Sequence, residues 1–413
     1  MTVRGANTET STTPTGPMSP WRFVVMFGTV SLLADFVYEG ARSITGPLLA
    51  SLGASAVLVG FVTGAGEAAA LGLRLVSGPM ADRTQRFWAF TIAGYALTVV
   101  TVPLLGLTGA LWAACALVIA ERVGKAIRSP AKDTLLSHAT AATGRGRGFA
   151  VHEALDQIGA VIGPLTVAGV LVISGGDYTP ALLVLAAPGV AVLALLVWLR
   201  ARVPDPAAYE PTTSVTATTS GNSNSSSTPP ARLPRAFWTY ATFTAATTLG
   251  FATFGVLSFH LVQQNLLPAA GVPVLYAAAM GVDAVAALAV GWLFDRHGPS
   301  VVAVLPLIAA GIPFLAFADS TTMAVAGCLL WGAAVGVQES TLKATVAELV
   351  PPARRATAYG IYAGIIGAAT LAGGTLTGAL YTYSIPALVI TVAAIQAAAL
   401  ALLVATRPRP TPA

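Results

Sequence analysis

Long apolar segments follow one another along almost the whole chain, and each is long enough to cross a lipid bilayer. A transmembrane helix needs roughly 20 apolar residues, with about 17 to 25 as the usual range. The predicted segments are twelve: 23–50, 55–77, 87–107, 110–128, 148–173, 179–200, 236–264, 272–294, 299–317, 321–346, 356–381 and 385–406. Only 9% of the 413 residues are charged, against about 25% in a soluble domain. The sequence therefore predicts an all-α, multi-pass membrane protein.

The basic residues outside these segments occur in alternate connections. They lie in the amino-terminal tail, in the connections that follow even-numbered segments, such as Arg83 and Arg86, and in the carboxy-terminal tail. The connections that follow odd-numbered segments, such as 51–55 and 382–384, contain none. Because cytoplasmic loops carry an excess of Lys and Arg, we expect both termini in the cytoplasm and an even number of spans. The pI of about 9.4 therefore needs no nucleic-acid partner.

One stretch in the middle of the chain differs sharply in composition from the rest. Residues 203–235 are rich in Ser, Thr, Asn and Pro and contain few large apolar residues, which is typical of a flexible linker. This linker divides the chain into two halves of six segments each. The predicted organisation is a cytoplasmic tail at 1–21, a six-helix bundle at 22–202, the cytoplasmic linker at 203–235, a second six-helix bundle at 236–406 and a cytoplasmic tail at 407–413.

The two halves repeat a short motif at corresponding places. Gly78-x-x-x-Asp82-Arg83 follows the second segment, and Gly291-x-x-x-Asp295-Arg296 follows the eighth. Internal repeats of this kind place a solute path between the halves, near the bilayer midplane.

At these residues the sequence resembles the major facilitator superfamily, whose signature between the second and third helices is a glycine, three residues, Asp-Arg, one residue, a second glycine and then basic residues. Gly78, Asp82, Arg83 and Arg86 match this signature, and Gln85 stands where the second glycine is usual. The second copy keeps that glycine as Gly298. The resemblance covers about residues 22–406. It implies twelve helices in two pseudo-symmetric six-helix bundles that carry a solute by alternating access.

The resemblance also implies a conformational latch at the cytoplasmic ends of the helices. Its expected members are Gly78, Asp82, Arg83, Arg86, Asp295, Arg296, Glu153 and Asp156. Acids and bases at helix ends can bind neighbouring helix termini and one another. An alternative is that these loops are ordinary basic loops that only set the topology.

Charged residues inside the predicted spans are concentrated in the first half. Each costs roughly 2.5–3.5 kcal/mol near the bilayer centre on insertion scales, so such residues usually face a cavity and partner one another. Asp35, Glu39 and Arg42 share one face of the first segment, and Glu67 lies in the middle of the second. The resemblance places the first, fourth, seventh and tenth helices around the central cavity. It thereby makes Asp35, Glu39, Arg122 and Glu339 cavity candidates.

A carboxylate in such a cavity can bind a proton on one side of the membrane and release it on the other. Asp35 is our first candidate, because it lies mid-span with no basic residue within one helical turn. Glu39 is the second, since Arg42 is only three residues away and can neutralise it. A nearby Arg122 would make either residue a proton switch. The structural alternative is a set of fixed ion pairs that hold helices together.

The fifth segment contains Gly159-x-x-x-Gly163-Pro164. Small residues four apart permit close helix packing, and the proline bends the helix. The antiporters of the superfamily carry a Gly-x-x-x-Gly-Pro motif at this position, extended by a further glycine pair. Here Val167 and Ala168 replace that pair, so the match favours export without establishing it.

The leading hypothesis is a proton-coupled exporter of a small organic solute in the bacterial cytoplasmic membrane. A symporter that takes up a nutrient or organic anion has the same fold and the opposite net flux. A non-transporting receptor or an enzyme is the third hypothesis, but the sequence contains no nucleotide-binding loop, metal-ligand cluster or nucleophile elbow. The expected partners are the solute, protons and lipid, without a cofactor or metal, and a monomer is expected. Charges of both signs leave zwitterions, amphiphilic cations and organic acids open as substrates.

Overall fold

The computed structural model describes residues 18–143, 145–209, 233–350 and 355–405, and in this part of the chain all regular structure is helical. The first half comprises α1 (Pro20–Ser51), α2 (Ala56–Gly72), α3 (Arg74–Thr84), α4 (Phe87–Leu107), α5 (Leu111–Thr143), α6 (Arg145–Ile173), α7 (Tyr178–Leu183) and α8 (Ala186–Arg202). After η1 (Pro206–Tyr209), the second half comprises α9 (Arg235–Leu249), α10 (Phe254–Gln263), α11 (Gly271–His297), η2 (Gly298–Ala303), α12 (Val304–Ala316), α13 (Thr321–Leu349), α14 (Arg355–Tyr383) and α15 (Ile385–Ala405).

The helices confirm the predicted all-α membrane fold. Ten of the described helices or helix pairs are long and apolar enough to cross a membrane, and Ser300–Ala316 is a shorter apolar helix. The remaining predicted span is α5, whose membrane portion carries Glu121, Arg122 and Lys125. Four of the twelve segments are broken helices: α2 with α3, α7 with α8, α9 with α10, and η2 with α12. A break in a membrane helix is tolerated where protein or a water-filled cavity surrounds the freed backbone groups.

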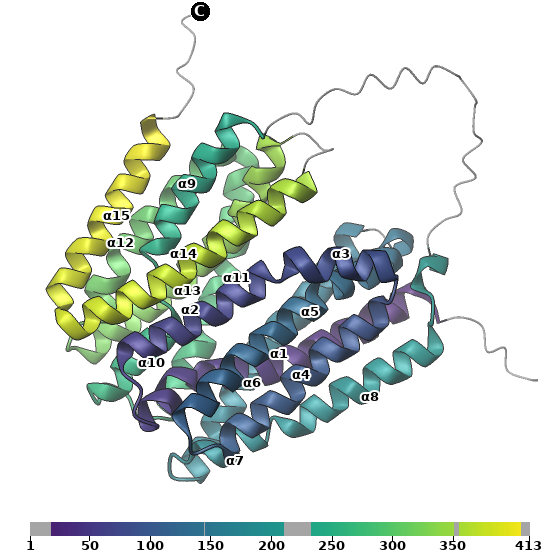
Figure 1. The fold of residues 1–413 in the computed structure, drawn as a ribbon, viewed down its shortest axis with the longest axis horizontal. Coiled ribbons are helices and arrows are strands. Elements are labelled where there is room, and N and C mark those ends of the chain that lie inside the picture. The colour runs from purple at the N-terminus through teal and green to yellow at the C-terminus, as the bar shows by residue number, and fades with distance from the viewer. Residues whose placement is uncertain (1–17, 144, 210–232, 351–354, 406–413) are drawn as a thin grey trace, which may run out of the picture.

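The two halves form separate bundles that diverge toward one end of the molecule. In Figure 1, α1–α8 occupy the lower right and most of α9–α15 the upper left, and the gap between them widens toward the side where α3 and the upper end of α9 lie. We call this the linker end, which carries Thr84, Arg202 and Arg235. The far end carries the opposite helix termini, including Ser51 and Leu107.

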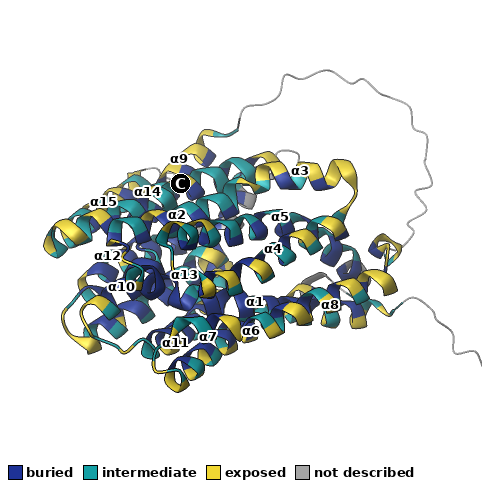
Figure 2. Ribbon diagram, turned by 60° about the horizontal axis from the view of Figure 1, so that its bottom comes forward, coloured by how far each residue is buried: buried dark blue, intermediate teal, exposed yellow. Residues whose placement is uncertain are grey.

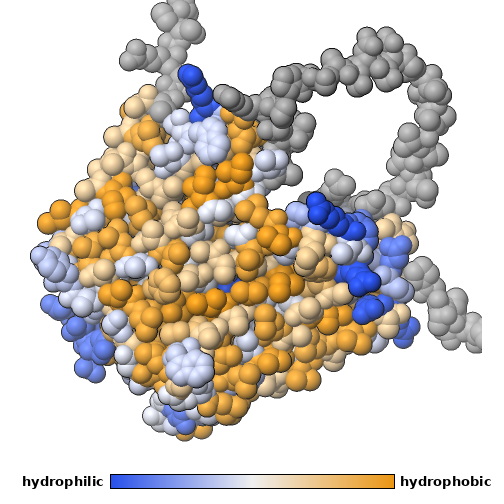
Figure 3. Space-filling view, viewed as in Figure 1, coloured by the Kyte–Doolittle hydropathy of each residue, from blue (hydrophilic) through white to orange (hydrophobic). Residues whose placement is uncertain are grey.

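Large apolar side chains cover much of the outside of both bundles. Trp112, Ile173 and Leu288 have exposed fractions of 78%, 88% and 78%. Exposed residues lie along the outer faces of the helices as well as at their ends (Figure 2). Figure 3 shows a broad apolar surface with hydrophilic residues gathered mainly at its edges. An apolar surface of this extent suits lipid rather than water.

Helix α6 lies directly against α1 at the glycine motif identified in the sequence. A Cβ added at Gly159 would collide with the carbonyl oxygen of Leu32, and one added at Gly163 with that of Phe36. The backbones therefore meet without intervening side chains, as expected for small residues four apart. This packing holds the face of α1 that carries Asp35 against the first-half bundle.

The halves meet closely at the far end. Gly60 of α2 and Gly374 of α14 approach backbone to backbone, because a Cβ on either residue would lie too close to the other's carbonyl oxygen. Thr63 of α2 also lies within hydrogen-bonding distance of Thr253, with 2.9 Å between the hydroxyl oxygens. Phe259 of α10 packs into the hydrophobic core of the first half. The far end is therefore closed.

The repeated loop motif ends both of its helices with a residue of positive φ. Gln85, which follows α3, has φ 55° and ψ 21°, and Gly298, which follows α11, has φ 64° and ψ −158°. A residue with positive φ commonly ends a helix, and glycine adopts it without a Cβ penalty. The two copies thus both turn through positive φ, but in different backbone conformations, and only the second has the glycine.

Candidate functional site

A cavity of about 990 Å³ lies between the two halves. Its first-half wall includes Arg42, Thr63, Glu67, Arg74, Asp82, Arg122 and Lys125, and its second-half wall includes Thr248, Phe251, Phe254, Trp331, Gln338, Glu339 and Tyr362. Because Asp82 lies near the end of α3, the cavity extends to the linker end, whereas the far end is closed. A volume of this size accommodates a typical small-molecule ligand.

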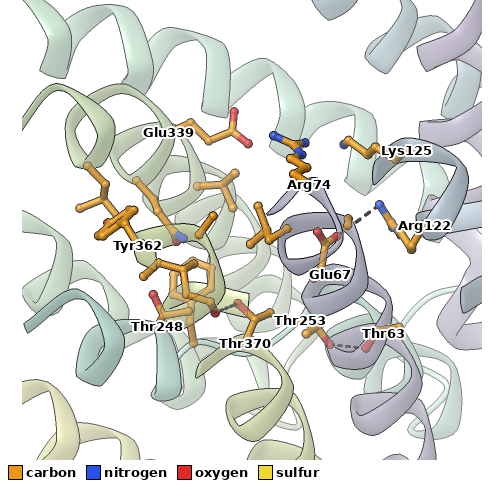
Figure 4. Close-up of a pocket in the computed structure, with 18 of the residues that line it drawn as sticks. Thr63, Glu67, Arg74, Arg122, Lys125, Thr248, Thr253, Glu339, Tyr362 and Thr370 are labelled. Atoms are coloured by element: carbon orange, nitrogen blue, oxygen red, sulfur yellow. Dashed lines mark hydrogen bonds and ion pairs between the residues drawn. The ribbon is translucent and has the colours of Figure 1, made fainter. Parts of the chain in front are cut away.

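Glu67 is the centre of an ion-pair network on the first-half wall. Its Oε1 lies 3.0 Å from Nη2 of Arg42 and 3.3 Å from Nη1 of Arg122. Arg42 also lies 3.6 Å from Glu39, and Arg122 lies 3.4 Å from Glu121. Figure 4 shows the ion pair between Glu67 and Arg122 at the cavity. The structure thus brings together Glu39, Arg42, Glu67 and Arg122, which the sequence singled out from three different segments.

Tyr38 of α1 joins this network from within the bundle. Arg122 and Lys125 both donate hydrogen bonds to its hydroxyl group, and the distance from Nζ of Lys125 to the hydroxyl oxygen is 3.0 Å. The Arg122 guanidinium carbon and the Lys125 Nζ also lie 4.4 Å and 4.2 Å from its ring centroid. Cations over a desolvated aromatic ring are stabilised by its quadrupole. Tyr38 therefore helps to hold two cations at the cavity wall.

Glu39 is also the acceptor of a hydrogen bond that crosses between the halves. The donor is the hydroxyl group of Tyr276 on α11. Both residues are buried. Sequence reasoning missed Tyr276, because one tyrosine in an apolar segment has no distinguishing pattern. The available signal was its spacing of seven residues from Asp283, which places both on one face of α11.

Asp35 and Glu39 are absent from the described lining of the cavity. Asp35 lies close to charged groups of α5 and α6, whereas Glu39 contacts Arg42 and Tyr276, so the role of each in proton coupling stays a prediction. The electrostatic neighbours of Asp35 include Lys125 and Lys132 of α5 and Asp156 of α6. Absence of a base nearby in sequence thus did not mean absence of a base nearby in space.

A second polar cluster near Asp35 is formed by side chains of α1, α5 and α6. Nζ of Lys132 is 3.9 Å from Asp156, and Nε2 of His152 is 2.9 Å from the hydroxyl oxygen of Ser31. The donor atoms of His152, Glu153 and Asp156 lie within 4.8 Å of one another. The ammonium group of Lys132 would compete with a metal cation for Asp156, so this cluster is better suited to an ion pair than to metal binding.

Asp283 of α11 is a further buried carboxyl group. Its side chain is 4% exposed, and Oδ1 has no hydrogen-bond partner among the described residues. It lies where α11 crosses Gly336 of α13. A buried polar atom without a partner is uncommon in folded proteins, so Asp283 is a second candidate for proton binding.

The predicted latch residues lie at the linker end and are mostly exposed. Asp82, Arg83, Arg86, Asp295, Arg296 and Glu153 are exposed, whereas Asp156 is half-buried in the cluster with Lys132. The guanidinium of Arg296 lies 3.7 Å from the ring centroid of Trp292. For Asp82, Arg83 and Arg86 the described residues provide no ion pair. Gly78 and Asp82 line the cavity mouth, so a latch here would act when the mouth closes.

A family model described as the Major Facilitator Superfamily matches residues 29–281 and 260–413. An uncharacterized protein of Mycobacterium tuberculosis is 61% identical over 413 residues, which cover 99% of this chain and 100% of that protein. An uncharacterized transporter of the MFS type from Methanocaldococcus jannaschii is 26% identical over 370 residues, which cover 87% of this chain and 89% of that protein.

Solved structures of transporters share the fold at low sequence identity. The nucleoside transporter NupG has a TM-score of 0.70 at 14% identity, covering 94% of this chain and 100% of that chain. A POT family transporter in complex with a thioalcohol conjugated peptide has a TM-score of 0.72 at 12% identity, covering 93% of this chain and 96% of that chain. At these identities the likeness concerns the fold.

Proposed function

The chain belongs to the major facilitator superfamily and is a secondary transporter rather than an enzyme, and on that premise we propose that it exports a small organic solute in exchange for protons. The observation that carries this proposal is the position of Glu39. One carboxyl group takes part both in the ion-pair network of the cavity and in a hydrogen bond between the halves.

This position links three events that an antiporter must couple. A solute that enters the cavity meets Arg42, which is paired with Glu67 and Glu39. A proton on Glu39 removes the negative charge that Arg42 neutralises, and it changes the group that accepts from Tyr276. Solute binding, proton binding and separation of the halves therefore act on the same few atoms. Exchange of solute for proton follows if the two ligands favour different conformations of the ion-pair network around Glu39.

The basic residues support a cytoplasmic location for the linker end. Arg83, Arg86, Arg202 and Arg296 all lie at this end of the helices, and positively charged loops favour the cytoplasm. With this orientation, in the bacterial cytoplasmic membrane, the open cavity takes solute from the cytoplasm. That is the loading state of an exporter, and the Gly159–Gly163 contact with α1 agrees with the antiporter-like motif.

The test uses purified protein in proteoliposomes with an imposed pH gradient. The solute is first found by screening compounds for thermal stabilisation, because a ligand that binds the folded state raises its stability by mass action. One proton that moves down a gradient of one pH unit supports a solute gradient of about tenfold. We expect solute to accumulate on the more acidic side of the membrane. Accumulation on the less acidic side would identify a symporter, and flux indifferent to the gradient would refute proton coupling.

A further inference from the structure

The two walls of the cavity carry opposite charge. The described first-half lining contains four cations, Arg42, Arg74, Arg122 and Lys125, against two carboxylates, Glu67 and Asp82, and is therefore net positive, whereas the charged residue in the described second-half lining is Glu339. Figure 4 shows Glu339 on one side of the cavity, with Arg74 and Lys125 on the other. A ligand that spans the cavity therefore meets basic groups at one end and a carboxylate at the other.

Not all four cations have a carboxylate partner. Arg42 and Arg122 are bound by Glu67, with additional ion pairs to Glu39 and Glu121. By contrast, the described ion pairs include none to Arg74 or Lys125.

Nε of Arg74 is buried without a hydrogen-bond partner among the described residues. Lys125 donates to a neutral phenol, that of Tyr38. These two cations are therefore best placed to receive an anionic group, to which a charged donor binds more strongly than to a neutral acceptor.

The wall between the charged groups is aromatic on the second-half side. Phe254 and Trp331 pack with ring centroids 5.3 Å apart, and Tyr362 lies farther along the same wall. The indole N–H of Trp331 is already occupied by the carbonyl oxygen of Ala252 at 2.9 Å. Phe254 and Trp331 are buried, and the half-buried Phe251, whose ring centroid is 6.5 Å from that of Trp331, presents apolar surface to a ligand. This surface suits a hydrophobic or aromatic body.

We propose that the transported solute is a zwitterion with an apolar, preferably aromatic, body. Arg74 and Lys125 bind its anionic end, and Glu339 binds its cationic end. A simple anion would be repelled by Glu339, and a simple cation by the bases of the first half. A zwitterion bridges both halves, so its two contacts strengthen as the walls approach. Because a ligand shifts a conformational equilibrium only through differential affinity for the two states, a bridging ligand favours closure of the cavity.

This inference rests on the proposed transport function, but its test is a binding measurement without a pH gradient. The probes are para-aminomethylbenzoate and the longer para-aminomethylphenylbutyrate. Each is compared with the same molecule lacking the amino group and with the same molecule lacking the carboxylate. We expect at least one zwitterion to raise the Tm of the purified protein more than both of its singly charged relatives. Equal or greater stabilisation by the singly charged relatives, or no stabilisation by any probe, would overturn the proposal.

Variants assign each end of the ligand to its wall. In Glu339→Gln the zwitterion should bind about tenfold more weakly and lose its advantage over the matched anion. In Lys125→Gln or Arg74→Gln the zwitterion should no longer bind more tightly than the matched amine. Asp319→Asn and Arg202→Gln, on exposed residues outside the cavity, should leave the preference unchanged. An unchanged preference in Glu339→Gln would refute the assignment.

Failure of this inference and failure of the transport function give different results. If an anion or an amine binds and is moved by a pH gradient in proteoliposomes, the zwitterion assignment is wrong and the transporter stands. If the zwitterion binds with the expected charge dependence but is never moved, the assignment stands and the proposed transport function is wrong.

Discussion

Tyr276 of α11 donates a hydrogen bond to Glu39 of α1, and this bond joins the two halves of the molecule at the cavity's ion-pair network. Both residues are buried, so neither can exchange this partner for bulk water while the halves remain together. When the halves separate here, the Glu39 carboxyl must find another donor or take up a proton. An unsatisfied buried carboxylate would otherwise cost several kcal/mol.

Tyr276→Phe removes the donor with little change in shape. We expect it to uncouple the pH gradient from solute movement, so that gradient-driven accumulation falls by about tenfold or more while solute binding persists. Proteoliposome flux and thermal stabilisation by the solute measure the two effects. Tyr383→Phe, at an exposed far-end tyrosine, is the matched control. Full accumulation in Tyr276→Phe would show that the bond is structural only.

Asp35→Asn mimics a permanently protonated carboxyl group in shape. If Asp35 carries the coupled proton, pH-driven transport should be lost while passive exchange of solute is retained. The measurement compares both fluxes in proteoliposomes, with Asp319→Asn as the control. A full gradient response in the variant would transfer the role to Glu39, Glu67 or the buried Asp283.

Asp82→Asn tests the latch at the cavity mouth. It removes a charge without changing shape, so we expect folded protein in the membrane with transport reduced at least several-fold. Asp205→Asn is the control, because Asp205 is exposed at the same end and lies outside the motif. If transport by Asp82→Asn is normal, the motif serves only as a topology signal.

Cysteine labelling tests the orientation. Single cysteines placed in the linker at 203–235 and in both tails should be labelled only after a membrane-impermeant reagent gains access to the cytoplasm. The two native free cysteines, Cys115 and Cys328, both lie in helices. They would first be replaced, so that only the introduced cysteine can react. Labelling of the linker in intact cells would reverse the orientation.

The glycine contact at the far end should limit how the halves close. Gly60→Val would force α2 away from the carbonyl oxygen of Gly374, so the far end should open and the labelling of nearby single cysteines should rise several-fold. Gly72→Val lies in the same helix where an added Cβ meets open space, and it is the matched control. Unchanged labelling in Gly60→Val would show that the contact does not close the far end.

The fold could be predicted because its strongest determinants are local. Segment length and apolarity indicate the spans, and the spacing of Gly159 and Gly163 indicates a close helix contact that the structure contains. The network of Arg42, Glu67 and Arg122 could also be anticipated, since charges buried in a membrane need partners. These inferences depend on composition and helical spacing, which the chain displays directly.

The rest of the site depends on how each helix is rotated about its axis. Asp35 and Arg42 lie on one face of α1 by spacing, yet only Arg42 lines the cavity. The packing of α6 on Leu32 and Phe36 decides which part of that face is covered. Tyr276 was missed for the same reason, because its partner is 237 residues away in the chain.

Gln85 and Gly298 end equivalent helices with positive φ, but their ψ angles differ, 21° against −158°. Gln85 is in the left-handed helical region, which costs a residue with a Cβ about 1–2 kcal/mol, whereas the conformation of Gly298 is one that essentially only glycine adopts. The near-symmetric halves therefore turn differently at equivalent positions: the turn after α3 accepts a side chain, and the turn after α11 requires glycine. We expect Gly298→Ala to destabilise its turn and Gln85→Gly to be tolerated, despite the shared architecture of the two bundles.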